Sequence, residues 1–301
     1  MNTLTVFTCT YNRSHTLERL YQSLTRQTSK DFNWLIIDDG STDKTKELVL
    51  EFQQQKNDFE IRYCYKDNGG LYTGYNKAIE LMNTELCVCI DSDDYMPDNA
   101  VEIILSFWKT HGNKEYAGIV GLDFYMNGGP IGGFFPEGLK SSFITNLTKY
   151  HKGDVKMVHR VELLKKVAPM PGAPNEKFAN PIYLFLKVDK YLPMLIINKN
   201  LCFVDYQDAN NSMSKNIFYQ YKQSPNSFAQ LRLLALQDKR TSYLNKIKNT
   251  IHYISSCIFA RKYRQILLSP MRCETILLLP LGLALNIFIR YKVYSSKNHY
   301  R

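Results

Sequence analysis

The sequence lacks the features of a secreted, disulfide-bonded or membrane-spanning chain. Its seven cysteines are scattered, odd in number and without a C-x-x-C pair, which is typical of reduced thiols in a cytosolic protein. No basic stretch precedes an apolar one at the start, so we expect no signal peptide. The apolar run at 276–289 spans 14 positions, whereas a membrane-spanning helix needs roughly 18 to 20. We therefore expect a cytoplasmic chain that does not cross a membrane.

Three common ligand-binding motifs are also absent. The sequence has no G-x-G-x-x-G and no phosphate loop ending in Gly-Lys-Ser/Thr. A calcium loop of the D-x-D-x-D-G type fits poorly, because Met96 occupies the position that requires glycine. The dinucleotide fingerprint, the phosphate-loop ATPases and the calcium-loop proteins are therefore disfavoured.

The positive charge is confined to one part of the chain. The net charge is +10, and residues 239–301 hold 12 Lys/Arg but a single acid, Glu274. The rest of the chain is almost neutral, with 26 Lys/Arg and 27 Asp/Glu. Because these basic residues flank apolar segments rather than an aromatic stacking platform, we disfavour nucleic-acid binding.

The basic segment also carries apolar residues at helical spacing. Ile247, Ile251, Ile254 and Ile258 recur between two clusters of Lys and Arg. Cationic apolar helices of this kind lie on anionic membranes. The alternative is that these helices pack onto the body as core while their basic residues are solvated. We favour the membrane-surface interpretation, because acids are nearly absent here.

Strand and helix patterns alternate four times in the first third of the chain. Short β-branched runs predict strands at 4–10, 34–39, 61–66 and 86–90, and each is followed by a helical pattern. Such alternation predicts an α/β fold with a mainly parallel, Rossmann-like sheet flanked by helices. The basic segment predicts a helical C-terminal extension. Sheets of this kind bind ligands beyond the carboxyl ends of their strands.

Polar clusters follow each of these predicted strands. They read TCTYNR, DDGSTD, DNGG and DSDD along the chain. The last cluster places Asp91, Asp93 and Asp94 within four positions, and these carboxylates would repel one another without a cation between them. Oxygen ligands suit a hard divalent cation. The sequence therefore predicts a metal-assisted ligand site at one edge of the sheet.

These motifs resemble those of a known family. TVFTCTYNR, IIDDGSTD, DNGGLYTGYNKAI and CIDSDD look like the successive donor-site motifs of the family 2 glycosyltransferases, which have the glycosyltransferase A fold. The likeness covers residues 2 to about 110. Further on, NEKF at 175–178 and YQDANNSMSKN at 206–216 look like a subgroup that builds bacterial capsular or other surface polysaccharides. The sequence departs from that subgroup at Pro181, where a glutamate is usual, and at Ala209, where a glycine is common.

The resemblance implies roles for the residues of these motifs. Asp93 would hold Mn²⁺ or Mg²⁺ between the two phosphates of a nucleotide-sugar donor. Asp91 would contact the ribose or base side, Asp39 would accept a hydrogen bond from the base, and Tyr11 would line the base pocket. The full implied set for the donor is Thr10, Tyr11, Asn12, Arg13, Asp39, Gly70, Asn76, Asp91 and Ser92. The alternatives are a turn or capping role for Asp39 and ordinary packing for Tyr11.

The resemblance also implies a catalytic base, Glu176, which matches the glutamate of the subgroup's EKF triplet. One carboxylate suffices for an inverting displacement in which a metal assists the leaving group. Its alternative is a surface glutamate paired with Lys177. Asp189 and Asp205 are weaker candidates. His159 could complete the metal shell, although a lone histidine before a helix is more often structural.

Together these features predict an inverting glycosyltransferase of surface polysaccharide synthesis. The donor would be a nucleotide-diphosphate sugar, with a UDP-sugar favoured, and the acceptor would be lipid-linked or a glycan at the inner face of the plasma membrane. Residues 1–125 would bind the donor, residues 126–215 would complete the acceptor side, and residues 216–301 would dock to the membrane or a partner. The alternative is a catalytically silent scaffold that binds nucleotide sugars or glycans.

Overall fold

The computed structural model describes residues 3–173, 175–205 and 217–298. The chain divides into two compact units. The sheet unit comprises Met1–Pro169 and Val188–Asp205, and the helical unit comprises Met170–Lys187 and Tyr206–Arg301. The expected segment YQDANNSMSKN, which includes Ala209, lies outside the described residues.

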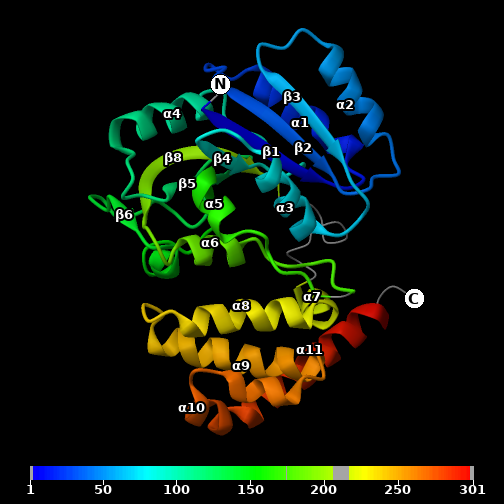
Figure 1. Cartoon of the computed structure of the whole chain (residues 1–301), viewed down its shortest axis with the longest axis vertical. Coiled ribbons are helices and arrows are strands. Elements are labelled where there is room, and N and C mark those ends of the chain that lie inside the picture. The colour runs from blue at the N-terminus through cyan, green and yellow to red at the C-terminus, as the bar shows by residue number, and fades with distance from the viewer. Residues whose placement is uncertain (1–2, 174, 206–216, 299–301) are drawn as a thin grey trace. The chain divides into compact units, whose positions relative to one another are not determined.

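The sheet unit alternates strands and helices through its first half, as Figure 1 shows. Its elements in chain order are β1 Leu4–Thr10, α1 Ser14–Thr25, β2 Phe32–Asp38, α2 Thr45–Gln54, β3 Glu60–Tyr65, α3 Leu71–Leu81, β4 Leu86–Cys89, α4 Ala100–His111, β5 Gly118–Tyr125, β6 Ser141–Ser142, the 3₁₀-helix η1 Ile144–Lys149, β7 Val155–Arg160, α5 Val161–Val167 and β8 Met194–Val204. The predicted strand at 4–10 coincides with β1, and the other predicted strands coincide with β2, β3 and β4 to within two residues at each end.

The eight strands found in the described part of the chain form one sheet in the order β3-β2-β1-β4-β7-β5-β8-β6. The first four are parallel neighbours, as the alternation predicted. Antiparallel β7 then separates β4 from β5, and β5 and β8 are again parallel. The predicted fold class, an α/β sheet flanked by helices with a helical C-terminal region, is therefore confirmed. The antiparallel insertion was not predicted.

The core of the sheet unit lies between the sheet and the apolar faces of its helices. In α1 one apolar face is buried, with Leu17, Leu20, Tyr21 and Leu24 at helical spacing. Tyr21 stacks on the ring of Phe52 from α2 at a centroid distance of 4.1 Å. Burial of such side chains stabilises the fold by roughly 1.5 to 3 kcal/mol each. This packing fixes the helices, and with them the loops at the strand ends.

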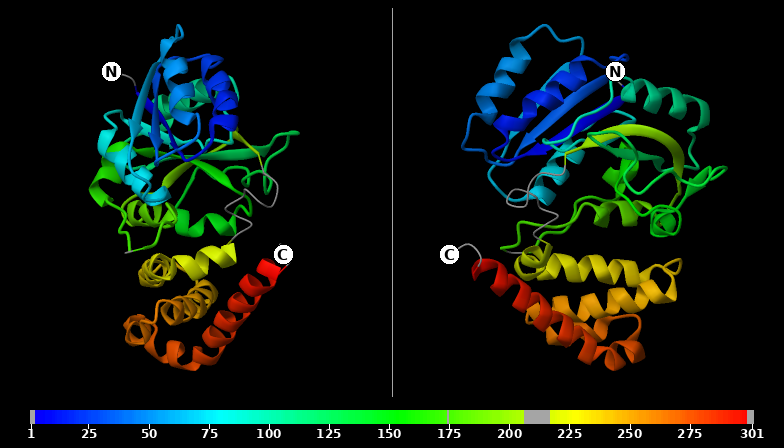
Figure 2. Two further views of the ribbon diagram at one scale, coloured as in Figure 1. Left: turned by 90° about the vertical axis from the view of Figure 1, so that its right-hand side faces the viewer. Right: turned by 180° about the vertical axis from the view of Figure 1, so that it is seen from behind.

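The helical unit begins with α6, Ile182–Val188, most of which belongs to it. Its later elements are α7 Ile217–Gln223, α8 Pro225–Gln237, α9 Tyr243–Phe259, the 3₁₀-helix η3 Tyr263–Leu268, α10 Arg272–Leu277 and α11 Leu279–Asn298. Helix α9 contacts both α8 and α11, and Figure 2 shows these three side by side in yellow, orange and red. Among the described residues, no helix combines the length and the apolar character needed to cross a membrane.

The close packing of α9 and α11 buries one residue of the isoleucine pattern. Ile254 is fully buried in the core of the helical unit. A Cβ atom at Gly282 of α11 would lie 2.4 Å from Cγ2 of Ile254, so only glycine allows this approach. Ile254 therefore packs as core, whereas Ile247, Ile251 and Ile258 are half-buried, and the membrane expectation for this segment stays a prediction.

The division into units differs from the expected division at one place. Residues 170–187, which carry the NEKF motif, cluster with the helical unit although they precede β8 in the sequence. The expected boundaries near 125 and 215 describe functional parts rather than compact units. As functional parts they stay a prediction.

Candidate active site

The polar loops meet at one edge of the sheet because their strands are parallel and in register. Thr10 at the end of β1 pairs with Asp38 at the end of β2, and Asp38 pairs with Tyr65 at the end of β3. β4 ends nearby, with Cys89 paired to Phe7. Ligands of parallel α/β sheets bind beyond such carboxyl ends. The structure therefore gathers the four predicted loops of the sheet unit on one side.

The loop after β1 is tied to the loop after β2. Asn12 has a φ of 53°, and its backbone N–H donates to Oγ of Ser41 at 2.9 Å. Its side-chain oxygen accepts from the backbone N–H of Thr42 at 2.8 Å. Thr10 is buried, whereas the ring of Tyr11 is 48% exposed. This loop therefore exposes the ring of Tyr11 to solvent, whereas Asn12 makes its hydrogen bonds to the loop after β2.

Asp39 is buried and organises the glycine-rich loop after β3. Its carboxylate accepts hydrogen bonds from the backbone N–H groups of Gly69 at 3.0 Å and Gly70 at 2.7 Å. It also accepts from Nζ of Lys66 and Nδ2 of Asn68. Gly70 has a φ of +92°, which favours glycine. Both carboxylate oxygens of Asp39 thus hold the glycine-rich loop, which agrees with the alternative that Asp39 has a turn role. A direct hydrogen bond from a nucleobase to Asp39 stays a prediction.

The cluster after β4 presents two carboxylates with different surroundings. Asp91 is exposed, Ser92 is buried and Asp93 is half-buried. Burial and the neighbouring carboxylate of Asp91 raise the pKa of Asp93. The raised pKa shows that negative charge is disfavoured at Asp93 in the absence of a nearby cation. A divalent cation would relieve that cost.

The donor atoms present fit a cation that takes most of its ligands from a substrate. Among the described residues, no group of three or more His, Cys, Asp or Glu side chains is arranged to hold a metal ion by itself. Mg²⁺ is commonly held by one or two carboxylates together with substrate phosphates. Asp93 with Asp91 nearby matches that type. His159 lies within β7, buried and paired through its backbone register with Cys87.

Lys156 of β7 is a buried residue that the sequence interpretation missed. Its Nζ lies 3.6 Å from Oδ1 of Asp123 and 4.0 Å from Oδ2 of Asp94. Burial opposes the charge of Lys156, but the carboxylates outweigh it and raise its pKa. Burial also raises the pKa of Asp94 to about 7 and that of Asp123 to about 6, although Lys156 acts to lower both. A lysine between Val155 and Met157 in a strand is the signal that could have identified it.

Arg19 of α1 is a second missed residue, and it connects the aspartate cluster to the end of β8. Its guanidinium donates to the backbone oxygen of Asp93 and, at 2.8 Å, to Oδ2 of Asp205. It also lies over the ring of Tyr95, 5.5 Å from the centroid. Asp205 also donates its backbone N–H to Oδ1 of Asp94 at 3.1 Å. These contacts hold the cluster in place from two sides.

The two weaker candidates for the base have structural partners. Asp205 is ion-paired with Arg19. Asp189 is fully buried, and its carboxylate accepts from the backbone N–H groups of Ile144 and Thr145 at the start of η1. A carboxylate at that position satisfies amide groups that have no partner inside the helix. Asp189 therefore holds the start of η1.

Glu176 lies in the helical unit and is also buried. Its Oε1 accepts from the backbone N–H of Asn226 at 2.8 Å and from its Nδ2 at 2.7 Å. Its Oε2 accepts from the backbone N–H of Ser227 at 2.8 Å and from its Oγ at 2.7 Å. Four donors thus hold the carboxylate at the N-terminus of α8, where negative charge is favoured. The alternative of a surface glutamate does not apply, because Glu176 is buried, and its catalytic role stays a prediction.

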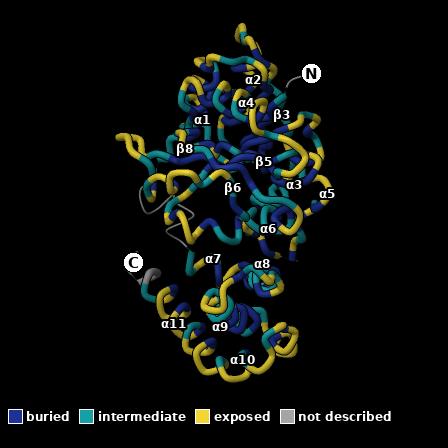
Figure 3. The backbone as a smooth tube through the Cα atoms, turned by 90° about the vertical axis from the view of Figure 1, so that its left-hand side faces the viewer, coloured by how far each residue is buried: buried dark blue, intermediate teal, exposed yellow. Residues whose placement is uncertain are grey.

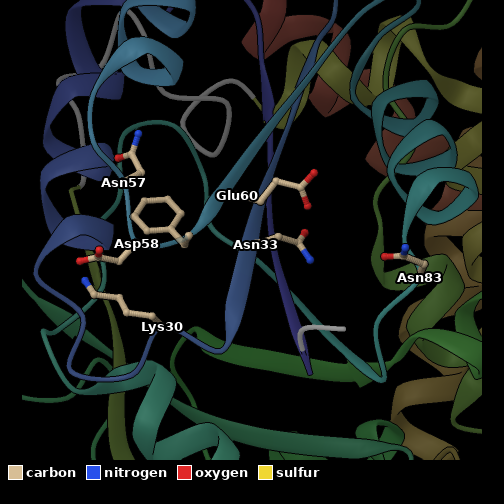
Figure 4. A pocket seen from close by; sticks show the side chains of 7 residues that line it. Lys30, Asn33, Asn57, Asp58, Glu60 and Asn83 are labelled. Carbon is tan, nitrogen blue, oxygen red and sulfur yellow. The ribbon is translucent and has the colours of Figure 1, made fainter.

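Two hollows lie near the sheet unit's loops, at different ends of the strands. The one in Figure 4 has a volume of about 480 Å³ and is lined by Lys30, Asn33, Asn57, Asp58, Phe59, Glu60 and Asn83. Asn33 and Glu60 are at the starts of β2 and β3, so this hollow is at the amino ends, away from the candidate site. The second, of about 520 Å³, is lined in part by Lys66, Thr73 and Asn76. Of the predicted donor residues, it therefore includes Asn76.

Comparison with known proteins agrees with this geometry. Residues 5–154 match the family model described as Glycosyl transferase family 2. Chondroitin synthase of Pasteurella multocida (strain Pm70) is 26% identical over 228 residues, which are 73% of this chain and 22% of the synthase. The alignments with the first three curated relatives cover 41%, 14% and 22% of their lengths, so the chain matches less than half of each.

Two solved structures share the fold at low sequence identity. Residues 1–349 of TarS from S. aureus, in complex with UDP-GlcNAc, are 16% identical, with a TM-score of 0.59 over 99% of this chain and 92% of that chain. A mannosyltransferase from Pyrobaculum calidifontis, in complex with GDP-Man and Mn²⁺, is 13% identical, with a TM-score of 0.59 over 99% of this chain and 84% of that chain. Because both likenesses extend over nearly the whole chain, they include its helical C-terminal region.

Proposed function

This chain is a glycosyltransferase of family 2, and from that premise we propose that it transfers a sugar from a nucleotide-diphosphate sugar to a lipid-linked or glycan acceptor in surface polysaccharide synthesis. The observation that carries the proposal is the gathering of four donor-type loops at one sheet edge, with Asp91 and Asp93 side by side. UDP-sugars are the favoured donors. One structural neighbour holds UDP-GlcNAc and another holds GDP-Man, so pocket shape rather than fold decides the nucleotide.

The residues of the sheet unit have distinct roles in this proposal. Tyr11 provides an exposed ring on which the base can stack, and Asp39 positions the loop whose Gly70 and Asn76 approach the donor. Thr10, Asn12 and Arg13 shape the base pocket, and Ser92 with Asp91 faces the ribose. Asp93 would hold Mn²⁺ or Mg²⁺, which would supply Lewis-acid charge to the leaving diphosphate. Support for the metal comes from the raised pKa of Asp93 and from the Mn²⁺ complex of a structural neighbour.

The proposed chemistry is a single inverting displacement. The acceptor hydroxyl oxygen forms a bond to the anomeric carbon, the bond from that carbon to the diphosphate oxygen breaks, and the hydroxyl proton passes to a carboxylate base. Glu176 is our proposal for that base, supported by the match of NEKF to the subgroup motif. To accept a proton, its carboxylate must weaken part of its hydrogen bonding to Asn226 and Ser227.

We place the reaction at the cytoplasmic face of the plasma membrane, with the protein bound peripherally. Support comes from the excess of basic residues in 239–301 and from the absence of a spanning helix among the described residues. Growth of a surface polysaccharide on a lipid carrier would require such a position.

The first test is donor binding and turnover by the Asp93→Asn variant. Binding of UDP-sugars is measured by calorimetry with Mn²⁺ and with EDTA, and turnover by release of free UDP. We expect Asp93→Asn to lower turnover by about 10²- to 10³-fold, because it removes roughly 3 to 4 kcal/mol of charge stabilisation. Asp98→Asn is the matched control, since Asp98 is exposed and paired with Arg26 outside the site. Equal turnover by the wild type and Asp93→Asn would refute the metal role.

A scaffold that binds donors without transfer is the second candidate. The observation in its favour is that all four hydrogen bonds of Glu176 are made within the protein. The same experiment separates the two, because a scaffold would bind a nucleotide sugar and release no UDP.

A further inference from the structure

Helix α11 is apolar on two opposite sides. One side is buried and contacts α9 and α7; its members are Gly282, Asn286, Ile289 and Val293. The opposite side is exposed; its members are Leu283 at 50%, Ile287 at 58%, Tyr291 at 63% and Tyr294 at 67%, with Phe288 at 46% on one margin, where its ring also packs edge-on against that of Phe218 of α7. We call these five residues the α11 stripe. A helix that is apolar all round is normally covered on every side.

The preceding elements show the same exposure. Leu267 and Leu268 of η3 are 55% and 63% exposed, and Ile276 and Leu277 of α10 are 56% and 78% exposed. Figure 3 shows long exposed stretches, in yellow, along α10 and α11. Single exposed leucines need no explanation, but many on one short segment indicate an interaction surface.

Basic residues border the α11 stripe on both sides. With 3.6 residues per turn, Arg290 and Lys292 fall on opposite margins of the exposed sector. The guanidinium of Arg290 lies 4.7 Å from the ring centroid of Phe259, and Nζ of Lys292 lies 5.7 Å from that of Phe288. Long basic side chains in such positions extend their charge past an apolar surface towards polar headgroups.

The charge pattern favours one occupant for this surface. Between 239 and 301 the sequence has 12 basic residues against Glu274 alone. A second copy of the chain, facing the first through the same stripe, would bring Arg290 and Lys292 near their own counterparts with few acids to pair them. An anionic lipid layer instead offers an apolar interior to the stripe and negative headgroups to its margins.

We propose that the helical unit docks on an anionic lipid surface through the α11 stripe, with α11 lying in the plane of the interface. The 12 residues from Leu283 to Tyr294 give a contact about 18 Å long. The proposed docking element is thus α11, whereas Ile254 of α9 belongs to the core of the helical unit. Docking itself does not require catalysis. The idea that a lipid in the same surface carries the acceptor is a further step, and it rests on the proposed glycosyl transfer.

The test is co-sedimentation of the full chain with two kinds of vesicle, phosphatidylcholine alone and phosphatidylcholine mixed with phosphatidylglycerol. We expect wild-type protein to bind the mixed vesicles more tightly. Ile287→Glu should weaken that binding at least about tenfold, because it replaces an inserted side chain by a charge. Lys292→Gln should weaken it by about fivefold and leave binding to phosphatidylcholine unchanged. Leu50→Glu is the matched control, since Leu50 is a 41% exposed leucine of α2 in the sheet unit.

The outcomes separate docking from catalysis. Donor binding is measured on the same proteins without vesicles, so a chain that binds UDP-sugars but no vesicles refutes docking alone. Equal vesicle binding by the wild type and Ile287→Glu would also overturn the proposal. A wild-type dimer in solution that Ile287→Glu dissociates, without vesicle binding, would show that a second copy covers the stripe. Circular dichroism confirms that each variant is folded.

Discussion

The sheet unit and the helical unit depart from the usual distribution of residues in opposite directions. The sheet unit buries charge, with Lys156 held between Asp94 and Asp123 beside the aspartate cluster. The helical unit exposes apolar side chains, with Leu277 78% and Tyr291 63% exposed. Buried charge and exposed apolar surface both cost free energy, so each normally marks a functional place. This difference agrees with the two proposals, a charged donor at the sheet unit and an apolar docking surface on the helical unit, although the helical unit also buries Glu176.

Among the variants that test this difference between the units, the one that removes the buried positive charge of Lys156 should have the largest effect on stability. Lys156→Met leaves the carboxylates of Asp94 and Asp123 buried without a neighbouring cation. We therefore expect the variant to lose about 3 to 5 kcal/mol in the free energy of unfolding. Chemical denaturation followed by tryptophan fluorescence measures this loss in the sheet unit, because both tryptophans, Trp34 and Trp108, lie there.

The double variant Lys156→Met with Asp123→Asn is the control for this effect. It removes one negative charge together with the positive one, so it should recover part of the lost stability. A single variant as stable as the wild type would show that the buried ion pairs do not hold the aspartate cluster.

The sequence predicted the parts of the site that depend on local pattern. Strand β1 was predicted at its observed bounds because its apolar residues and its polar end lie within seven positions. The loop of Asp91 and Asp93 was placed correctly because parallel strands end at a common edge. These features need no knowledge of which distant strands pair.

The remaining parts depend on contacts between distant segments. Lys156 is next to Asp123 only because antiparallel β7 lies between β4 and β5, a pairing that local periodicity does not determine. Glu176 is held at α8 by Asn226 and Ser227, about 50 residues later in the chain. Exposure of the α11 stripe likewise follows from which side of the helix α9 covers.

The next prediction tests whether the helical unit carries chemistry as well as an apolar surface. Glu176→Gln should lower kcat by about 10²-fold if its carboxylate accepts the acceptor proton. It should also lower the free energy of unfolding by about 1 to 2 kcal/mol, since a charged cap at α8 is lost. Steady-state kinetics with excess donor and a thermal melt measure the two effects separately.

Ser227→Ala is the matched variant for this test. It removes one donor to Glu176 and keeps the carboxylate, so it should lower stability by about 1 kcal/mol with kcat nearly unchanged. Parallel losses of kcat and stability in both variants would make Glu176 a helix cap only, and the sheet unit would then hold all the chemistry that the proposal needs.

The smallest expected effect concerns one histidine in each unit, the buried His159 and the half-buried His252. Burial lowers the pKa of His159 in β7 to about 3, and burial with Arg232 lowers that of His252 in α9 to about 4. Both histidines are neutral in the folded protein, so below pH 6.5 the unfolded chain binds protons that the folded chain does not. Stability therefore falls as pH falls, by about 1.4 kcal/mol per unit for His159 between about pH 6.5 and pH 3.

His159→Gln isolates this contribution from that of the carboxylates. Asp94 and Asp123 have raised pKa values, so they bind protons first in the folded state and change stability in the opposite direction, but equally in both proteins. Between pH 6.5 and pH 5.5 the wild type should lose about 1 kcal/mol more than the variant by tryptophan fluorescence. Equal losses would mean that the pKa of His159 is the same in the folded and the unfolded chain, so that burial does not keep this histidine neutral.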